Sequence, residues 1–255
     1  MSRRLTSLLA AAAILVLPVS GAMAADGHSY IPDVKFSSDG PFGTYDKASL
    51  QRGLHVYRSV CAACHGMKRV AFRNLEALGY NEAQIKTIAS QYSVVDGPND
   101  EGEMFERPSL PSDRMHGPYA NDAAARYSNN GALPPDLSLI TKARVGGAAY
   151  VYGILTGYEE PPEGTELLDG QYWNKSMTGH VIAMAPPLSD GQVAYEDEAP
   201  QTVDQYSKDV SHFLAWAAEP EMEARKAMGV RVFLFLAAFA GIMIAVKRKI
   251  WAKLH

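Results

Sequence analysis

Two cysteines and a histidine in the segment YRSVCAACHGMKRV (residues 57–70) constrain this chain more than any other feature. Cys61 and Cys64 are the only cysteines among 255 residues, and His65 follows directly. The order C-x-x-C-H is the attachment signature of c-type haem, in which both thiols bond to the porphyrin and the histidine faces the iron. The segment therefore predicts one covalent haem c, with the short spacing placing both sulfurs on one edge of the group.

Other uses of a cysteine pair fit the sequence less well. A thioredoxin-like redox site would need a surrounding βαβ pattern, which is absent. A zinc site would need a second pair of ligands at similar spacing, and no cysteine remains to supply it.

The residues before the motif predict a helix that delivers the cysteines to the core. Asp46 is a suitable N-cap, and Arg52, His55 and Arg58 fall outside the apolar face, so we expect them to be solvated. The residues at helical spacing on that face are Leu50, Leu54, Tyr57 and Cys61.

The ligand on the other side of the iron decides the chemistry, because an open position suits ligand or peroxide chemistry and a second strong ligand leaves electron transfer. Met184 stands out, since the segment VIAMAPPL (181–188) is apolar and stiffened by two prolines. His180 is the second choice. The other candidates are Met104, Met115, Met177, His116 and His212.

Both ends of the chain carry membrane-related signals. In residues 1–24, two arginines precede a short apolar run and a small-residue cleavage site, which predicts a secretory signal peptide. Near the other end, residues 232–246 carry no charge and are followed by a basic cluster with Trp251. Residues 228–250 are long enough to cross a bilayer if the flanking basic side chains reach the interfaces. We expect residues 220–255 to hold a transmembrane anchor and a short cytoplasmic tail.

Between these signals, residues 25–219 are expected to form one extracytoplasmic haem domain. Pro220 is placed to open the anchor helix at its first turn. The helix predicted before it has an apolar stripe of Val203, Tyr206, Val210, Phe213, Leu214 and Ala217.

The charge of the chain argues against nucleic acid as a partner. Removing the leader takes away two of the 24 basic residues and none of the 28 acidic ones, which leaves a net charge near −6. Acidic residues gather at 96–106 and 195–204, either as plain solvated surface or as a docking surface for a basic protein.

Five segments together resemble one family. They are LQRGLHVYRSVCAACHGM (50–67), NNGALPPDLSLITKAR (129–144), YVYGILTGYEEPPEG (150–164), IAMAPPL (182–188) and KDVSHFLAWAAEPE (208–221). In this order they resemble cytochrome c1, the membrane-anchored haem subunit of the bacterial cytochrome bc1 complex (ubiquinol–cytochrome c reductase). The resemblance covers nearly all of the chain after the leader.

The resemblance implies roles for particular residues. Cys61 and Cys64 would carry the haem, with His65 and Met184 as the iron ligands. Arg144 would pair with a haem propionate, a contact suited to a guanidinium. The remaining cofactor-binding residues that it implies are Asn129, Pro134, Pro135 and Tyr150. From spacing alone, the two prolines indicate only a turn.

The resemblance also implies a fold and a function. The fold would be mainly α, a c-type cytochrome haem domain with long loops plus one C-terminal transmembrane helix. The chain would sit in the bacterial inner membrane as a single-pass protein, with its haem domain on the periplasmic side. It would pass single electrons from the Rieske iron–sulfur subunit to cytochrome c, beside cytochrome b, in a dimeric respiratory or photosynthetic complex. It would be an electron-transfer subunit and no enzyme on its own.

Two other functions remain open from the sequence. One is a stand-alone membrane-anchored cytochrome c that shuttles electrons, which co-purification with partner subunits would distinguish. The other is a haem enzyme of the peroxidase type with an open iron, which the absence of a methionine–iron absorption band would favour.

Overall fold

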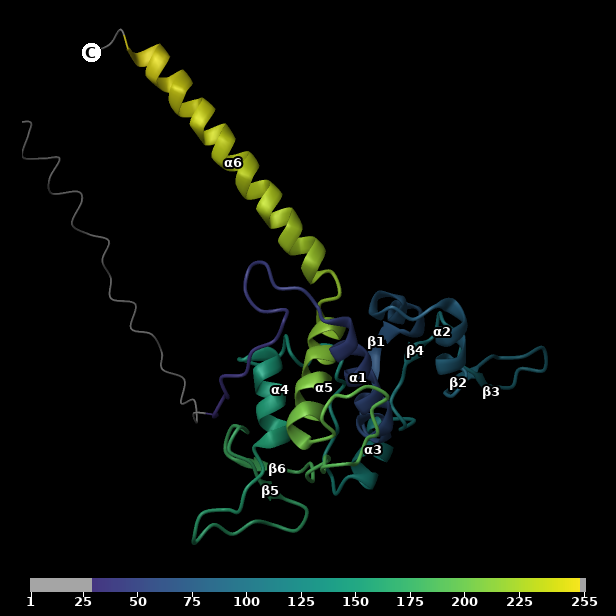
Figure 1. Ribbon diagram of the computed structural model, residues 1–255. Coiled ribbons are helices and arrows are strands. Elements are labelled where there is room, and N and C mark those ends of the chain that lie inside the picture. Colours follow the sequence, from purple (N-terminus) through teal and green to yellow (C-terminus); the bar gives the residue numbers. More distant parts are fainter. Residues whose placement is uncertain (1–28, 253–255) are drawn as a thin grey trace, which may run out of the picture.

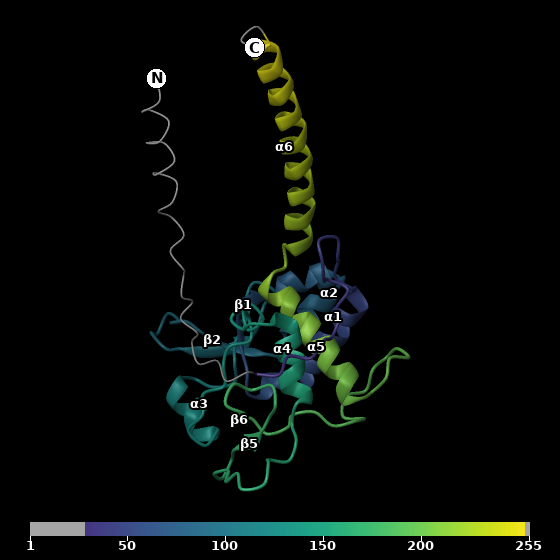
Figure 2. The same ribbon diagram turned by 90° about the vertical axis from the view of Figure 1, so that its left-hand side faces the viewer.

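The computed structural model describes residues 29–252, and helices dominate among them (Figures 1 and 2). This confirms the expected mainly α fold, whereas the expected signal peptide at residues 1–24 lies outside the described residues. The helices are α1 (Lys47–Ser59), α2 (Glu82–Ala89), α3 (Asp122–Ser128), α4 (Gly147–Thr156), α5 (Val203–Ala218) and α6 (Met222–Trp251), with the 3₁₀ helices η1 (Cys61–Ala63) and η2 (Phe72–Leu78). The strands are β1 (Met67–Ala71), β2 (Ser93–Asp96), β3 (Phe105–Pro108), β4 (Arg114–Met115), β5 (Tyr172–Trp173) and β6 (Val181–Ile182).

Helices α1 and α5 pack against each other at the centre of the domain, and α4 packs on α5 (Figure 1). Helix α1 begins at the predicted cap, where the Asp46 carboxylate accepts the N–H of Ala48 at 3.1 Å. The strands add three short antiparallel ladders, β1–β4, β2–β3 and β5–β6, around this helical centre. Most residues of both predicted apolar stripes are buried, whereas Cys61, in η1, and Val203 are only partly buried. The buried ones are Leu50, Leu54, Tyr57, Tyr206, Val210, Phe213, Leu214 and Ala217.

Gly53 lets α1 and α5 approach closely. A Cβ at this position would lie 2.1 Å from the carbonyl oxygen of Asp209 and 2.6 Å from Cβ of Phe213. We expect Gly53→Ala to lower the free energy of unfolding by about 3 kcal/mol. The new Cβ would clash with backbone atoms of α5, which cannot move aside as the end of a flexible side chain can. Thermal unfolding should show a Tm lower by roughly 10 °C. Gly229→Ala in α6, where a Cβ meets nothing within 4 Å, is the control and should leave the Tm unchanged.

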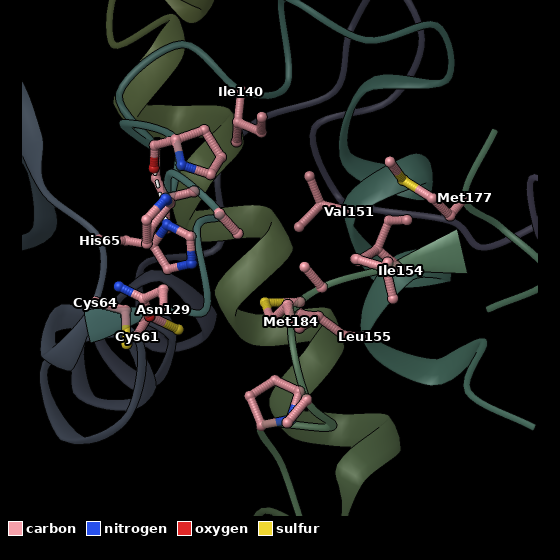
Figure 3. Close-up of a pocket in the computed structure, with 18 of the residues that line it drawn as sticks. Cys61, Cys64, His65, Asn129, Ile140, Val151, Ile154, Leu155, Met177 and Met184 are labelled. Carbon is pink, nitrogen blue, oxygen red and sulfur yellow. Dashed lines mark hydrogen bonds between the residues drawn. The ribbon is translucent and has the colours of Figure 1, made fainter. Parts of the chain in front are cut away.

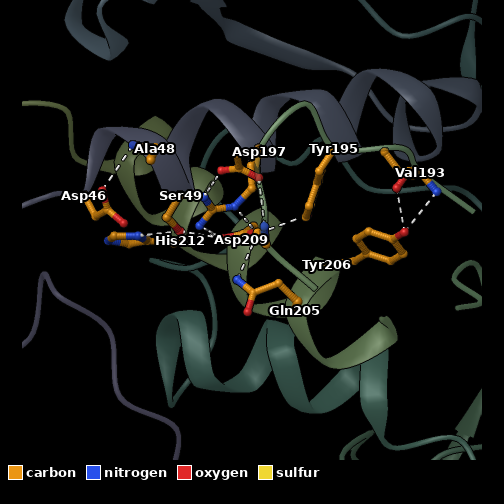
Figure 4. A network of polar contacts seen from close by, with 12 residues as sticks. Asp46, Ala48, Ser49, Val193, Tyr195, Asp197, Gln205, Tyr206, Asp209 and His212 are labelled. Carbon is orange, nitrogen blue, oxygen red and sulfur yellow. Dashed lines mark hydrogen bonds and ion pairs between the residues drawn. The ribbon is translucent and has the colours of Figure 1, made fainter. Parts of the chain in front are cut away.

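Arg52 is not solvated, contrary to the prediction from its place off the apolar stripe. Its side chain is 17% exposed, and the guanidinium donates to both carboxylate oxygens of Asp209, at 2.8 and 3.1 Å, and to Asp197 at 2.7 Å. Figure 4 labels these two acceptors, Asp209 and Asp197. These partners lie about 150 residues away, so no local periodicity could reveal them. The other donors to the Asp209 carboxylate are Ser49, Tyr195 and Gln205. The network ties the segment before α5 to α1.

Helix α6 extends away from the domain in both views (Figures 1 and 2). Its 30 residues correspond to about 45 Å, and it is long and apolar enough to cross a membrane. The helix begins at Met222 with Glu221 as its N-cap, so Pro220 precedes the helix and does not open it as predicted. Lys247 lies 5.4 Å from the centre of the Trp251 ring, as in an interfacial anchor.

Candidate functional site

The C-x-x-C-H motif forms one tight turn at the end of α1. After α1 ends at Ser59, η1 carries Cys61 into a turn in which the N–H groups of Cys64 and His65 both donate to the Cys61 carbonyl, at 3.1 and 2.9 Å. This turn places both cysteines and the histidine on the wall of a single cavity.

His65 is oriented by the segment that follows α3. Its Nδ1 lies 2.8 Å from the carbonyl oxygen of Pro135 and donates to it, which leaves Nε2 free as an acceptor. Asp136 braces this segment by accepting the N–H groups of Lys68 and Ser138, at 2.8 and 3.0 Å. Burial lowers the pKa of His65 despite the Pro135 hydrogen bond, so the imidazole is neutral and able to bind a metal.

The cavity next to His65 has a volume of about 700 Å³, within the range of pockets that enclose a small molecule. Its walls are mostly apolar and come from the motif turn, the segment after α3, helices α4 and α5, and the segment after β6 (Figure 3). The apolar residues from the two helices are Val151, Ile154, Leu155, Val210 and Leu214.

Of the candidate second ligands, only Met177 and Met184 line the cavity. The sulfur of Met177 accepts a hydrogen bond from the Tyr150 hydroxyl at 3.6 Å, so it already has a partner. In the view of Figure 3, Met184 faces His65 across the open space, and Met177 lies beyond Val151. His180, the second choice from the sequence, stacks on Trp173 at 5.0 Å and does not line the cavity.

The Met184 segment is held by a contact that the sequence did not reveal. The Tyr158 hydroxyl donates to the Met184 carbonyl oxygen at 2.9 Å. Because burial raises the pKa of Tyr158, the hydroxyl keeps its proton and the hydrogen bond persists at any pH near neutrality. Two prolines follow at 186 and 187 and further restrict the backbone.

The environment of the cysteines disfavours dithiol redox chemistry. Burial raises the pKa of the Cys61 thiol to about 12, whereas redox-active cysteines have a lowered pKa. The two residues are not joined by a disulfide. An apolar surrounding that keeps a thiol neutral suits a cysteine that is alkylated by a hydrophobic cofactor.

Two polar residues stand at the edge of this apolar space. Arg144 lines the cavity and is exposed; its guanidinium donates to the Ala143 carbonyl and pairs with no carboxylate among residues 29–252. Asn129 is fixed by donating to Tyr119 at 3.0 Å and to the Ala125 carbonyl at 2.6 Å. Arg144 is therefore available to an anionic group of a bound ligand.

All the residues proposed from the sequence lie around this one cavity: Cys61, Cys64, His65, Asn129, Pro134, Pro135, Arg144, Tyr150 and Met184. Their individual roles remain predictions. The sequence analysis missed the apolar wall from α4, although the spacing of Val151, Ile154 and Leu155 is helical and could have revealed it. Tyr158 carries no signal of its own in the sequence.

The residues around the cavity fit a covalent haem. Two cysteines stand on one edge, a neutral imidazole has a free Nε2, a thioether lies across the space, and the walls between them are apolar. An unpaired guanidinium at the edge suits a propionate.

Comparisons with known proteins agree on one family. The family model described as the cytochrome c1 family matches residues 36–254. The chain is 45% identical to cytochrome c1 of Rhodospirillum rubrum, covering 94% of both chains. It is 49% identical to "Cytochrome c1 1, heme protein, mitochondrial" of Arabidopsis thaliana, covering 88% of this chain and 73% of that protein.

A third relative is longer. The chain is 49% identical to "Cytochrome b/c1" of Bradyrhizobium diazoefficiens over 98% of its own length, and it spans 39% of that protein.

Proposed function

Because the chain belongs to the cytochrome c1 family, we propose that it is the haem subunit that accepts single electrons from a Rieske iron–sulfur protein and passes them to cytochrome c. Family members carry one covalent c-type haem in the bc1 complex, and Cys61 and Cys64 would hold that haem here. Haem c supplies a one-electron iron couple, and the chain supplies ligation, burial and docking.

The observation that supports the proposal is that two residues able to bind iron, His65 and Met184, face each other across an apolar cavity. His65 presents Nε2 from the motif turn, and Met184 presents its thioether from the stiffened segment after β6. If His65 and Met184 both bound the haem iron, no site would be left open for small molecules, which would favour electron transfer over peroxidase-type chemistry. Arg144 would bind a propionate and compensate its charge. Asn129, Pro134, Pro135 and Tyr150 would line the cofactor.

We further propose the topology that the ends of the chain suggest. Residues 1–24 would be removed as a signal peptide, residues 25–219 would form the periplasmic haem domain, and residues 220–255 would form the anchor with a cytoplasmic tail. The supporting feature is α6, which fits a single membrane span. The partners would be cytochrome b and the Rieske subunit, in a dimeric complex of the bacterial inner membrane.

Affinity purification of the full chain from detergent-solubilised membranes tests this function. A b-type haem subunit and a Rieske protein should purify with it, and ubiquinol should reduce the haem of the preparation. A haem-loaded chain that purifies alone and that ubiquinol does not reduce would contradict the proposal and favour a stand-alone shuttle.

Tyr158→Phe should weaken the hold on Met184 without changing the ligands. The loss of one hydrogen bond is worth about 1 kcal/mol, so external imidazole should displace the methionine with roughly fivefold higher affinity. An optical imidazole titration of the oxidised protein measures this. Tyr172→Phe is the matched control, since Tyr172 also lines the cavity and its hydroxyl makes no hydrogen bond among the described residues. Equal affinities for both variants would refute the role of Tyr158.

A basic cytochrome c could dock on the acidic segment before α5. Glu196 and Glu198 are exposed, whereas Asp197 is paired with Arg52 and accepts the N–H of Ala199. We expect Glu196→Gln with Glu198→Gln to slow reduction of a basic cytochrome c severalfold at low ionic strength, and the difference to vanish at high salt. Stopped-flow absorbance measures it. If neither the double substitution nor a rise in ionic strength changed the reduction rate, this segment would be excluded as the docking surface for cytochrome c.

A further inference from the structure

The loop of residues 36–45, between the start of the described chain and α1, has a fixed backbone. The N–H of Thr44 donates to the Ser37 carbonyl at 3.0 Å, and the Ser37 hydroxyl donates back to the Thr44 carbonyl at 2.8 Å. The exposed Asp39 accepts the N–H of Phe36 through its carboxylate at 2.9 Å. Gly43 permits the close return of the chain, since a Cβ there would lie 2.1 Å from the Asp39 carbonyl oxygen.

The same loop is fastened to the beginning of α6. The half-buried Lys226 ammonium donates to the carbonyl oxygens of Ser38 at 2.7 Å and Gly43 at 3.0 Å. Glu223, in the first turn of α6, accepts the N–H of Tyr45 at 2.7 Å. Lys226 and Glu223, both near the start of α6, therefore fix the position of the loop along the axis of this helix.

The tip of the loop is apolar and exposed. Phe42 is 80% exposed, and Pro41 beside it is exposed as well, whereas Phe36 and Tyr45 in the same loop are partly buried. A phenyl ring left in water forgoes burial free energy, and the hydrogen bonds within the loop hold Phe42 at its exposed tip.

The tip lies on the side of the domain from which α6 emerges. In both views the purple segment before α1 rises beside the first turns of α6 (Figures 1 and 2). The uncharged stretch of α6 begins at residue 232, six residues after Lys226, a rise of about 9 Å along the helix. The loop is thus at the level where a spanning helix meets the interface, a level that favours aromatic side chains.

We propose that the 36–45 loop is a second membrane contact, in which Phe42 and Pro41 enter the interface between lipid headgroups and acyl chains. The occupant is lipid because the tip continues the surface of α6, which fits a membrane span, and because the interface favours an exposed aromatic side chain such as Phe42. With α6 and the loop both in contact with the bilayer, the domain cannot rotate freely about the helix axis, and the haem faces its electron partners in one orientation.

A spin label at position 42 tests the proposal on the full-length, haem-loaded chain in lipid nanodiscs. In Phe42→Cys the new thiol is the only free one if Cys61 and Cys64 are bonded to haem, a point that rests on the proposed function. Wild-type chain treated with the same spin label tests separately whether haem is bonded to Cys61 and Cys64, because it can take up label only if those bonds are absent.

Power-saturation EPR should show a severalfold higher ratio of oxygen to Ni(II)-chelate accessibility at position 42 than at the control, Leu168→Cys. Leu168 is 73% exposed and belongs to the loop between α4 and β5, which lies at the end of the domain opposite α6 (Figure 1). Adding Lys226→Met to the labelled chain should increase label mobility and lower the ratio. Equal ratios at positions 42 and 168 would overturn the proposal. So would protection that appears only in the complete complex and not in nanodiscs of the chain alone, since that result would assign the tip to a protein partner.

Discussion

A chain with Cys61→Ala and Cys64→Ala should lose all haem that survives denaturing electrophoresis, and it should fail to accumulate as a folded protein. The cofactor would fill a cavity of about 700 Å³ whose wall includes residues of α4 and of α5, the helix that packs on α1 at the centre of the domain. Without it, apolar side chains on the cavity wall that the chain does not bury, such as Leu133 and Leu155, would face water or an empty space, and lost packing is strongly destabilising.

Haem staining of the gel and far-UV circular dichroism of the purified chain measure the two effects. Cys61→Ala alone is the control, since one thioether should still retain part of the haem stain. A double variant that accumulates with the unfolding temperature of the wild type would contradict the account, because the fold would then be independent of the group it is proposed to enclose.

Met184→Leu should abolish the methionine–iron charge-transfer band of the oxidised protein and lower the reduction potential. Leucine has a similar volume, so packing is largely preserved while the sulfur ligand is lost. Methionine–histidine ligation raises the potential, and axial ligands as a class span about 0.8 V, so we expect a drop of at least roughly 0.1 V. A redox titration followed by visible absorption measures both effects.

Met177→Leu is the matched control, because it makes the same change in the same cavity. It removes the acceptor of the Tyr150 hydroxyl but no proposed ligand, so the band should remain and the potential should move little. If Met177→Leu abolished the band and Met184→Leu kept it, the second iron ligand would be Met177 and the assignment of Met184 would be wrong.

The sequence predicts those parts of the fold that depend on local pattern. The stripe from Leu50 to Tyr57 and the stripe from Tyr206 to Ala217 lie on buried helix faces, and the uncharged run near the end of the chain forms one long exposed helix. Arg52 shows where local pattern fails, since its partners Asp197 and Asp209 come from the far end of the domain.

The residues of the site also differ in whether local sequence pattern can identify them. The cysteines and His65 are adjacent in sequence, so the motif alone identifies them. The sequence favours Met184 because two prolines stiffen its segment, but it does not show that Met177 reaches the same cavity. The Tyr150 hydrogen bond and the position of each sulfur relative to His65 distinguish the two methionines further. Tyr158 acts through a backbone carbonyl, a contact that leaves no pattern in the sequence.

A redox-titrated visible spectrum of the membrane complex purified through this chain, with a haem-stained gel of the same sample, tests haem ligation by His65 and Met184 most directly. We predict one haem-stained band at the position of the chain, one low-spin c-type component that titrates with a single electron, and a methionine–iron band in its oxidised form. A high-spin oxidised spectrum that shifts on adding small ligands, or a band without haem stain, would contradict ligation by His65 and Met184.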